Sequence, residues 1–251
     1  MPPPSSPREP DTGPRPRSPG RPSRPDPARP ARPHPPAALV LDFDGTIVNT
    51  EPFHEAALRA VARPHGLCLD PGCSLGRSDE HVLLAAFRAA RVPHTDDLIA
   101  ELVRDKARIF LDLATDPDAD LALYPGVRDL LESARAVSIP TAVCTASRRA
   151  ELDTLLPLLA IDHLIDHTVA AEDADRPKPD PAPYRETCRR LAADPPSVIV
   201  IEDSPTGVTS ATRAGCYVIA VTHTSVNSDL AHASEIIECI ASALRPRNRG
   251  A

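Results

Sequence analysis

Short, uninterrupted runs of apolar residues recur along the chain, and segments with apolar residues at helical spacing lie between them. An apolar run of four or five residues without alternation is typical of a strand buried on both faces, as in a parallel sheet. Such runs predict strands at 37–41, 141–145, 198–201 and 217–221, with a weaker one at 167–171. Helical patterns separate them at 126–136, 148–159, 180–191 and 206–214. This alternation predicts an α/β fold with a doubly wound parallel sheet.

A block without buried-strand runs interrupts the alternation after the first predicted strand. Its apolar pattern predicts three helices, at 51–62, 79–90 and 95–113. Because a block inserted there lies above the carboxyl ends of the strands, where open α/β sheets bind ligands, we expect it to act as a lid. The predicted division is therefore a core domain, 37–50 and 123–245, and a helical cap domain, 51–122.

The first 36 residues differ in composition from the rest of the chain. Residues 1–37 hold 15 of the 31 prolines and carry seven arginines against three acidic residues, a charge of +4. Since the total is −7, the remaining residues carry −11. A proline-dense segment that cannot bury apolar surface is expected to be disordered with polyproline II character. We therefore predict a disordered tail over 1–36 and an acidic globular body.

Composition excludes several classes of protein and partner. No apolar run approaches the 18 residues of a membrane span, and no apolar segment of a secretory signal precedes Ala37. An acidic body in a chain with seven aromatic residues disfavours nucleic acid as a partner. The six cysteines show no CxxC spacing and favour free thiols in a reducing cytoplasm. We expect a cytoplasmic protein without membrane or nucleic-acid partners; the sequence leaves its oligomeric state open.

Polar side chains follow the predicted strands at the points where the strands end. They are Asp42 and Asp44 after the first strand, Thr145 at the end of the second, and Glu202 and Asp203 after the fourth, with Lys178 just before the helix at 180–191. Because the carboxyl ends of parallel strands meet at one edge, these groups are expected to converge. Crowded carboxylates repel one another, so a divalent cation is implied, and an all-oxygen ligand set suits Mg²⁺.

Each feature has a plainer interpretation when it is taken alone. Asp-Gly after an apolar run is a common turn, and Glu-Asp-Ser before a helix is an ordinary acidic N-cap. The order of the features along the chain is far more specific than any one of them.

Four segments together resemble the motifs of haloacid dehalogenase-like hydrolases. They are DFDGTIVNTE at 42–51, Thr145 in VCTAS, Lys178 in RPKPDP and IEDSPTGV at 201–208. The resemblance covers residues 38–244 and is strongest to the branch with a helical cap after the first strand, which includes β-phosphoglucomutase-like enzymes and sugar-phosphate phosphatases. It implies a Rossmann-like core with an inserted α-helical cap and an enzyme that hydrolyses small phosphomonoesters.

The resemblance implies a role for each residue that would meet the phosphoryl group. Asp42 would be the nucleophile that forms an aspartyl-phosphate, and Asp44 the general acid and then the base. Thr145, the backbone amide of Ala146, and Lys178 would hold the phosphoryl oxygens. Dehalogenases lack the second aspartate, so the presence of Asp44 favours phosphoryl transfer.

The same resemblance implies a magnesium site. Asp203 would bind Mg²⁺ beside Asp42 and the backbone carbonyl of Asp44, with Glu202 as a ligand directly or through water. Independently, carboxylates at positions i and i+2 of an extended chain point to one side, so Asp42 and Asp44 can both reach one phosphate.

The cap is expected to select the substrate. His54 occupies the position of a histidine that assists the mutases, and residues 76–80 resemble the substrate-specificity loop. Arg77 and Lys106 are candidates to meet a second anionic group of the substrate. Where mutases carry an arginine three residues after the loop glycine, this sequence has Asp79, which favours a phosphatase.

Three functional hypotheses follow. The first is a Mg²⁺-dependent phosphatase that acts on small phosphomonoesters, sugar phosphates above all. The second is a hexose-phosphate mutase of the β-phosphoglucomutase type. The third, from a different class, is a non-catalytic interaction protein recruited through its proline-rich tail.

Overall fold

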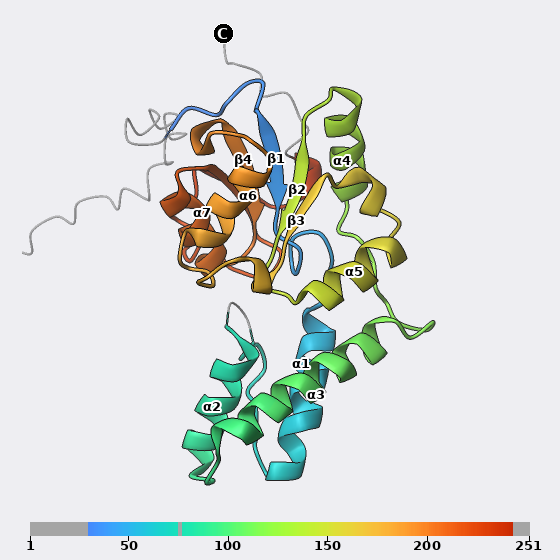
Figure 1. The fold of residues 1–251 in the computed structure, drawn as a ribbon, viewed down its shortest axis with the longest axis vertical. Coiled ribbons are helices and arrows are strands. Elements are labelled where there is room, and N and C mark those ends of the chain that lie inside the picture. Colours follow the sequence, from blue (N-terminus) through green and yellow to red (C-terminus); the bar gives the residue numbers. More distant parts are fainter. Residues whose placement is uncertain (1–29, 75–76, 243–251) are drawn as a thin grey trace, which may run out of the picture.

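The computed structural model describes residues 30–74 and 77–242. Most of the tail predicted for residues 1–36 lies outside the described residues. What is described forms two lobes, one built on a β-sheet and one built of helices (Figure 1).

The sheet has six parallel strands in the order β3-β2-β1-β4-β5-β6. The strands are β1 Ala38–Leu41, β2 Thr141–Cys144, β3 His167–Val169, β4 Val198–Glu202, β5 Tyr217–Val221 and β6 Glu235–Ile237. The predicted α/β fold class and five predicted strands are confirmed. The edge strand β6 was not predicted, because its three residues include one glutamate and are too short to form an apolar run.

Helices cover both faces of the sheet and explain the uninterrupted apolar runs. Alternate strand residues pack on α4 (Val127–Ala136) and α5 (Arg149–Leu158) on one face. The residues between them pack on α6 (Ala182–Arg190) and α7 (Pro205–Ala214) on the other face. Because both faces are buried, every position of β1, β2, β4 and β5 is buried.

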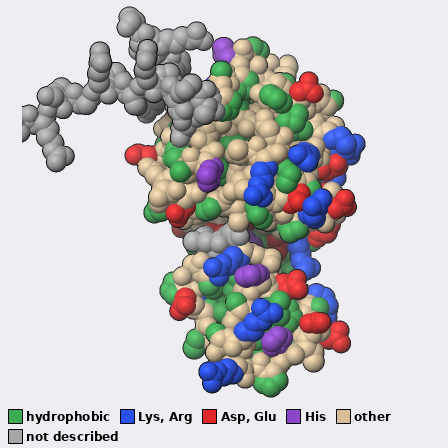
Figure 2. All heavy atoms as spheres, turned by 90° about the vertical axis from the view of Figure 1, so that its left-hand side faces the viewer, with side chains coloured by type: hydrophobic (Ala, Val, Ile, Leu, Met, Phe, Trp, Pro, Cys, Tyr) green, Lys and Arg blue, Asp and Glu red, His purple; other side chains and the backbone are tan. Residues whose placement is uncertain are grey.

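Three further helices form the second lobe: α1 (Glu51–Ala62), α2 (Asp79–Ala90) and α3 (Asp96–Ala114). They pack around an apolar cluster of their own, to which α1 contributes Leu58, α2 Phe87 and α3 Leu102. This separate cluster supports our proposal that residues 51–122 are a cap domain. Figure 2 shows the two lobes meeting at a waist, with charged side chains of both signs on the face in view.

Two chain segments connect the lobes and run side by side. Val48 and Leu123 form an isolated antiparallel bridge, and the Tyr124 amide donates a hydrogen bond of 2.9 Å to the Ile47 carbonyl. The cap is thus entered and left at one place, next to the carboxyl end of β1.

All six cysteines are free thiols, and Cys144, Cys188 and Cys216 are buried in the core. Among the described residues, no helix has both the length and the apolar character needed to cross a membrane.

Truncation of a core leucine should destabilise the sheet lobe strongly. Leu131 of α4 is fully buried, so Leu131→Ala is expected to lower the free energy of unfolding by about 3 kcal/mol through lost burial and a cavity. Leu158→Ala, at a side chain that is 55% exposed, should cost less than about 0.5 kcal/mol. Urea denaturation followed by circular dichroism measures both, and equal losses would contradict the core assignment.

Candidate active site

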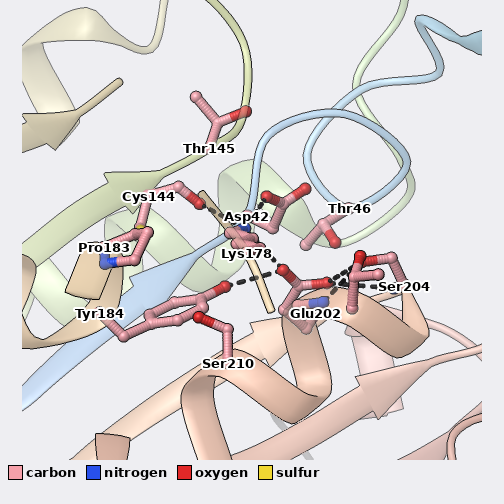
Figure 3. Close-up of polar contacts among 12 residues, drawn as sticks. Asp42, Thr46, Cys144, Thr145, Lys178, Pro183, Tyr184, Glu202, Ser204 and Ser210 are labelled. Atoms are coloured by element: carbon pink, nitrogen blue, oxygen red, sulfur yellow. Dashed lines mark hydrogen bonds and ion pairs between the residues drawn. The ribbon is translucent and has the colours of Figure 1, made fainter. Parts of the chain in front are cut away.

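Lys178 lies at the centre of the polar groups that gather at the carboxyl edge of the sheet. Its ammonium donates to Asp42 Oδ1 at 2.5 Å, to Glu202 Oε1 at 2.7 Å and to the Cys144 carbonyl at 3.0 Å (Figure 3). The side chain is only 6% exposed. Burial lowers the pKa of Lys178, but Asp42 and Glu202 outweigh burial and raise it above its ordinary value, so the ammonium stays charged.

Three buried carboxylates surround this ammonium. Asp42, Glu202 and Asp203 each offer an oxygen within 4.8 Å of the others. Burial, and then the charge of Glu202, raise the pKa of Asp203 to about 7, and burial raises that of Asp42 well above its ordinary value. One lysine does not compensate three carboxylates. The all-oxygen donor set therefore fits a hard divalent cation such as Mg²⁺.

Glu202 accepts hydrogen bonds from five donors and is fully buried. Its Oε1 accepts hydrogen bonds from the Lys178 ammonium and, at 2.8 Å, from the Tyr184 hydroxyl. Its Oε2 accepts from the backbone amides of Asp203 and Ser204, at 3.1 and 3.0 Å, and from the Ser204 hydroxyl, at 2.9 Å. A Cβ at Gly207 would overlap this carboxylate, so only glycine fits there. With both oxygens engaged by five donors, Glu202 fixes Lys178 and the loop after β4. Asp42 and Asp203 accept fewer hydrogen bonds and are the better candidates for metal ligands.

The Asp44 carboxylate lies outside this acidic cluster and contacts a different set of groups. Its Oδ1 accepts from the Thr50 hydroxyl at 2.5 Å and from His54 Nε2 at 3.2 Å. Its Oδ2 accepts from the hydroxyls of Thr145, at 3.2 Å, and Ser147. Burial raises the pKa of Asp44, but these donors, His54 first, outweigh burial and hold it well below its ordinary value.

A chain of polar contacts runs from Asp44 into the cap. Lys106 Nζ lies 2.7 Å from His54 Nδ1 and 2.9 Å from Asp79 Oδ2. Since an ammonium only donates, Nδ1 accepts, and the ring proton is on Nε2, which donates to Asp44. The His54 ring stacks on Phe110 at 4.1 Å between centroids. The chain Asp79–Lys106–His54–Asp44 thus joins all three cap helices to the core.

A cavity of about 610 Å³ lies between the lobes. It is lined by the predicted site residues Asp42, Asp44, His54, Arg77, Lys106, Thr145, Ala146, Lys178 and Asp203, whereas Glu202 is fully buried and is not part of the lining. The structure therefore brings the sequence-predicted residues to one place. Arg77 is exposed at the cap side of the cavity, whereas Lys106 is buried and already paired.

Sequence reasoning missed several side chains that hold the site together. They are Thr46 and Thr224, which donate to Asp203, Thr50 and Ser147, which donate to Asp44, and Tyr184, which donates to Glu202. Thr46, Thr50 and Ser147 lie inside the quoted motif segments, so their position was a usable signal. Thr224 lies after β5 and belongs to none of the recognised motifs, and Tyr184 occupies an apolar position of its helix, as a core residue would, so neither gave a usable signal.

The sequence matches the family model described as "Haloacid dehalogenase-like hydrolase" over residues 39–221. It is 29% identical to validoxylamine A 7'-phosphate phosphatase of Streptomyces hygroscopicus subsp. limoneus, over 79% of this chain and 92% of the relative. It is 30% identical to fructose-1-phosphate phosphatase YqaB of Escherichia coli strain K12, over 71% and 93%. In fold it is similar to the crystal structure of β-phosphoglucomutase from Clostridium difficile, with a TM-score of 0.72 at 21% identity over 83% and 93% of the chains.

Mg²⁺ should stabilise the protein more at pH 8 than at pH 5. Because the pKa of Asp203 is raised to about 7, the folded state keeps a proton that the unfolded chain loses near its ordinary pKa. Stability from this group is therefore lost as the pH rises towards about 7, and a divalent cation restores it once the cluster is ionised. At pH 5 the cation must displace protons.

Calorimetric Tm with EDTA and with Mg²⁺ measures this effect, which we expect to be several kelvin at pH 8 and little at pH 5. Asp203→Asn is the control and should show a reduced gain. An equal gain at both pH values would contradict a metal site made of these carboxylates.

Proposed function

The chain belongs to the haloacid dehalogenase-like hydrolase family, and from this premise we propose that it is a Mg²⁺-dependent phosphatase that hydrolyses small phosphomonoesters through an aspartyl-phosphate on Asp42. Several of its relatives are named phosphatases, which supports a phosphoric monoester hydrolase. The relatives' printed names include phosphorylated carbohydrates and hexitols, which support sugar and polyol phosphates as the substrate class. The observation that carries the proposal is the convergence of Asp42, Asp203 and Lys178 beside an Asp44 held by four donors.

In this proposal Asp42, Asp203 and the backbone carbonyl of Asp44 would hold Mg²⁺, and Glu202 would act through Lys178 and the loop after β4, which it fixes. The ion supplies positive charge beside the phosphoryl group, so that a carboxylate can approach a dianion. Residues of this chain carry out the nucleophilic attack and the proton transfers.

The Asp42 carboxylate attacks phosphorus, the bond between phosphorus and the ester oxygen breaks, and Asp44 gives a proton to the leaving alkoxide. In the second step Asp44 takes a proton from a water molecule that attacks the same phosphorus and releases Asp42. Thr145, the Ala146 amide and Lys178 hold the phosphoryl oxygens.

Lys178 has three ammonium protons and three acceptors. The Cys144 carbonyl belongs to β2 and Glu202 is held by four other donors, so both are fixed. The bond to Asp42 is the one that a phosphoryl oxygen can replace. Asp42 then becomes free to attack while Lys178 remains in place.

Asp44 needs different surroundings in the two steps. The donors in the structure favour its carboxylate, which is the form that activates water. To act as an acid it must carry a proton, and hydrogen bonds to the carboxylate oppose this. Since His54 and Thr50 lie where the chain enters the cap, we propose that displacement of the cap changes the protonation of Asp44.

The mutase alternative shares this core chemistry. Asp79, which pairs with Lys106, stands where mutases carry an arginine, and this supports hydrolysis over transfer to a sugar hydroxyl. A purely non-catalytic interaction protein is disfavoured by the complete set of site residues. We expect the enzyme to act on small phosphorylated molecules in the cytoplasm, where its six free thiols suit a reducing environment.

Asp42→Asn should reduce hydrolysis of p-nitrophenyl phosphate by at least about a thousandfold, because an amide is a poor nucleophile at phosphorus. Circular dichroism and Tm should report a folded protein. The exposed Asp162→Asn is the control and should keep wild-type turnover. Full activity in Asp42→Asn, or undiminished wild-type activity under strong chelation, would refute the proposal.

A product assay separates the phosphatase from the mutase. With β-glucose 1-phosphate and a bisphosphate primer, the phosphatase should release inorganic phosphate and form no glucose 6-phosphate above background. Accumulation of glucose 6-phosphate in excess of phosphate would favour the mutase.

A further inference from the structure

The chain has only two lysines, Lys106 and Lys178, and both lie in the cavity between the lobes. All its other basic side chains apart from histidine are arginines. Lys178 binds at the phosphoryl end, through Asp42 and Glu202. Lys106 comes from α3 in the cap and is 2% exposed. Lys106 is therefore the buried cation on the cap side of the cavity. With the phosphoryl group bound near Lys178, the alcohol part of a substrate must lie on this side.

The charge of Lys106 is already compensated. Asp79 Oδ2 lies 2.9 Å from its nitrogen and His54 Nδ1 lies 2.7 Å away. A buried ammonium in an ion pair presents little net charge to a ligand, because the carboxylate repels an approaching anion nearly as strongly as the ammonium attracts it. A second anionic group would have to break this pair.

The neighbouring groups add negative charge. Glu51 and Glu151 line the same cavity, and both interact electrostatically with Lys106 and His54. Arg77 and Arg148 also line it, but Arg77 is exposed and Arg148 half-buried, so water weakens their attraction for an anion. An uncharged, hydroxylated alcohol part meets no such penalty and can hydrogen-bond to these carboxylates.

We propose that Asp79 is a specificity-determining residue, which occupies Lys106 and so excludes substrates whose alcohol part carries a second anionic group. Under the proposed function, on which this inference rests, the substrates are monophosphates of uncharged polyhydroxy alcohols. The sequence alone suggests the opposite for Lys106, because the pairing with Asp79 arises only when α2 packs beside α3.

Asp79 also has a plain structural role that the test must separate. It is the first residue of α2, where an acidic side chain stabilises the helix through its dipole. Glu80 is the matched control. It lies in the same helical turn, lines the same cavity and forms no ion pair within the described part of the chain. Glu80→Gln therefore removes the same charge near the same helix end without releasing Lys106.

The experiment compares two ligands of the full-length protein with Mg²⁺, glucitol 6-phosphate and 6-phosphogluconate. They share a six-carbon chain and differ at the end far from the phosphate, where one has a hydroxymethyl group and the other a carboxylate. Calorimetric Kd values are measured in an Asp42→Asn background, so turnover does not interfere. The readout is the ratio of the two Kd values, which a merely structural loss would not move.

The Asp42→Asn protein with no further substitution should bind glucitol 6-phosphate at least about tenfold more tightly than it binds 6-phosphogluconate. Asp79→Asn should shift the ratio about tenfold in favour of 6-phosphogluconate, the size of one hydrogen bond from a released ammonium to a carboxylate. Glu80→Gln should leave the ratio within about twofold, and Asp79→Asn combined with Lys106→Met should abolish the shift.

Equal binding of the two ligands before substitution would overturn the inference. So would equal shifts from Asp79→Asn and Glu80→Gln, or a shift that persists without Lys106. Failure of the proposed function would show in a different measurement: the Asp42→Asn protein would still hydrolyse p-nitrophenyl phosphate.

Discussion

Burial of several carboxylates around one ammonium is the constraint on which the rest of the site depends. Parallel strands end at a common edge, so Asp42, Glu202 and Asp203 are close together because of topology alone. Their repulsion in a buried environment has to be offset, and Lys178 offsets only part of it. Hydrogen bonds from surrounding residues offset more of it: Tyr184 and Ser204 donate to Glu202, and Thr46 and Thr224 donate to Asp203. The negative charge that remains favours a divalent cation at this edge, and in the proposed function that cation, together with Lys178, would offer positive charge to a phosphoryl group.

A second network controls the proton that the proposed reaction moves. The donors to Asp44 come from the junction between the core and α1, through Thr50 and His54, and from the loop after β2, through Thr145 and Ser147. The Asp44 carboxylate therefore contacts side chains of both lobes. Because the two connecting segments are bridged at Val48 and Leu123, we expect a displacement of the helical lobe to move the segment that carries Thr50. In the proposed function, short-range contacts would thus link acid–base chemistry to the position of the helical lobe.

The sequence predicts the sheet well because burial on both faces leaves a plain signal, which β1 and β4 show and the three-residue edge strand β6 does not. It also predicts which polar residues reach the site, since strand ends of a parallel sheet must converge. What it cannot predict are partnerships between helices. Nothing local to Lys106 indicates that Asp79, 27 positions earlier, will pair with it. Likewise, the tyrosine in α6 has the pattern of a core residue, yet its hydroxyl is directed at Glu202.

The near absence of lysine makes this chain unusual as a subject for chemical labelling. Amine-acylating reagents find only Lys106, Lys178 and the N-terminal amine. Both side chains are buried, so each reacts only in molecules that have transiently opened around it. Both lysines line the cavity between the lobes, Lys106 on α3 and Lys178 beside the end of β2. The rates at which mass spectrometry finds the two lysines acylated would thus report, residue by residue, how often each side of this cavity becomes accessible to solvent.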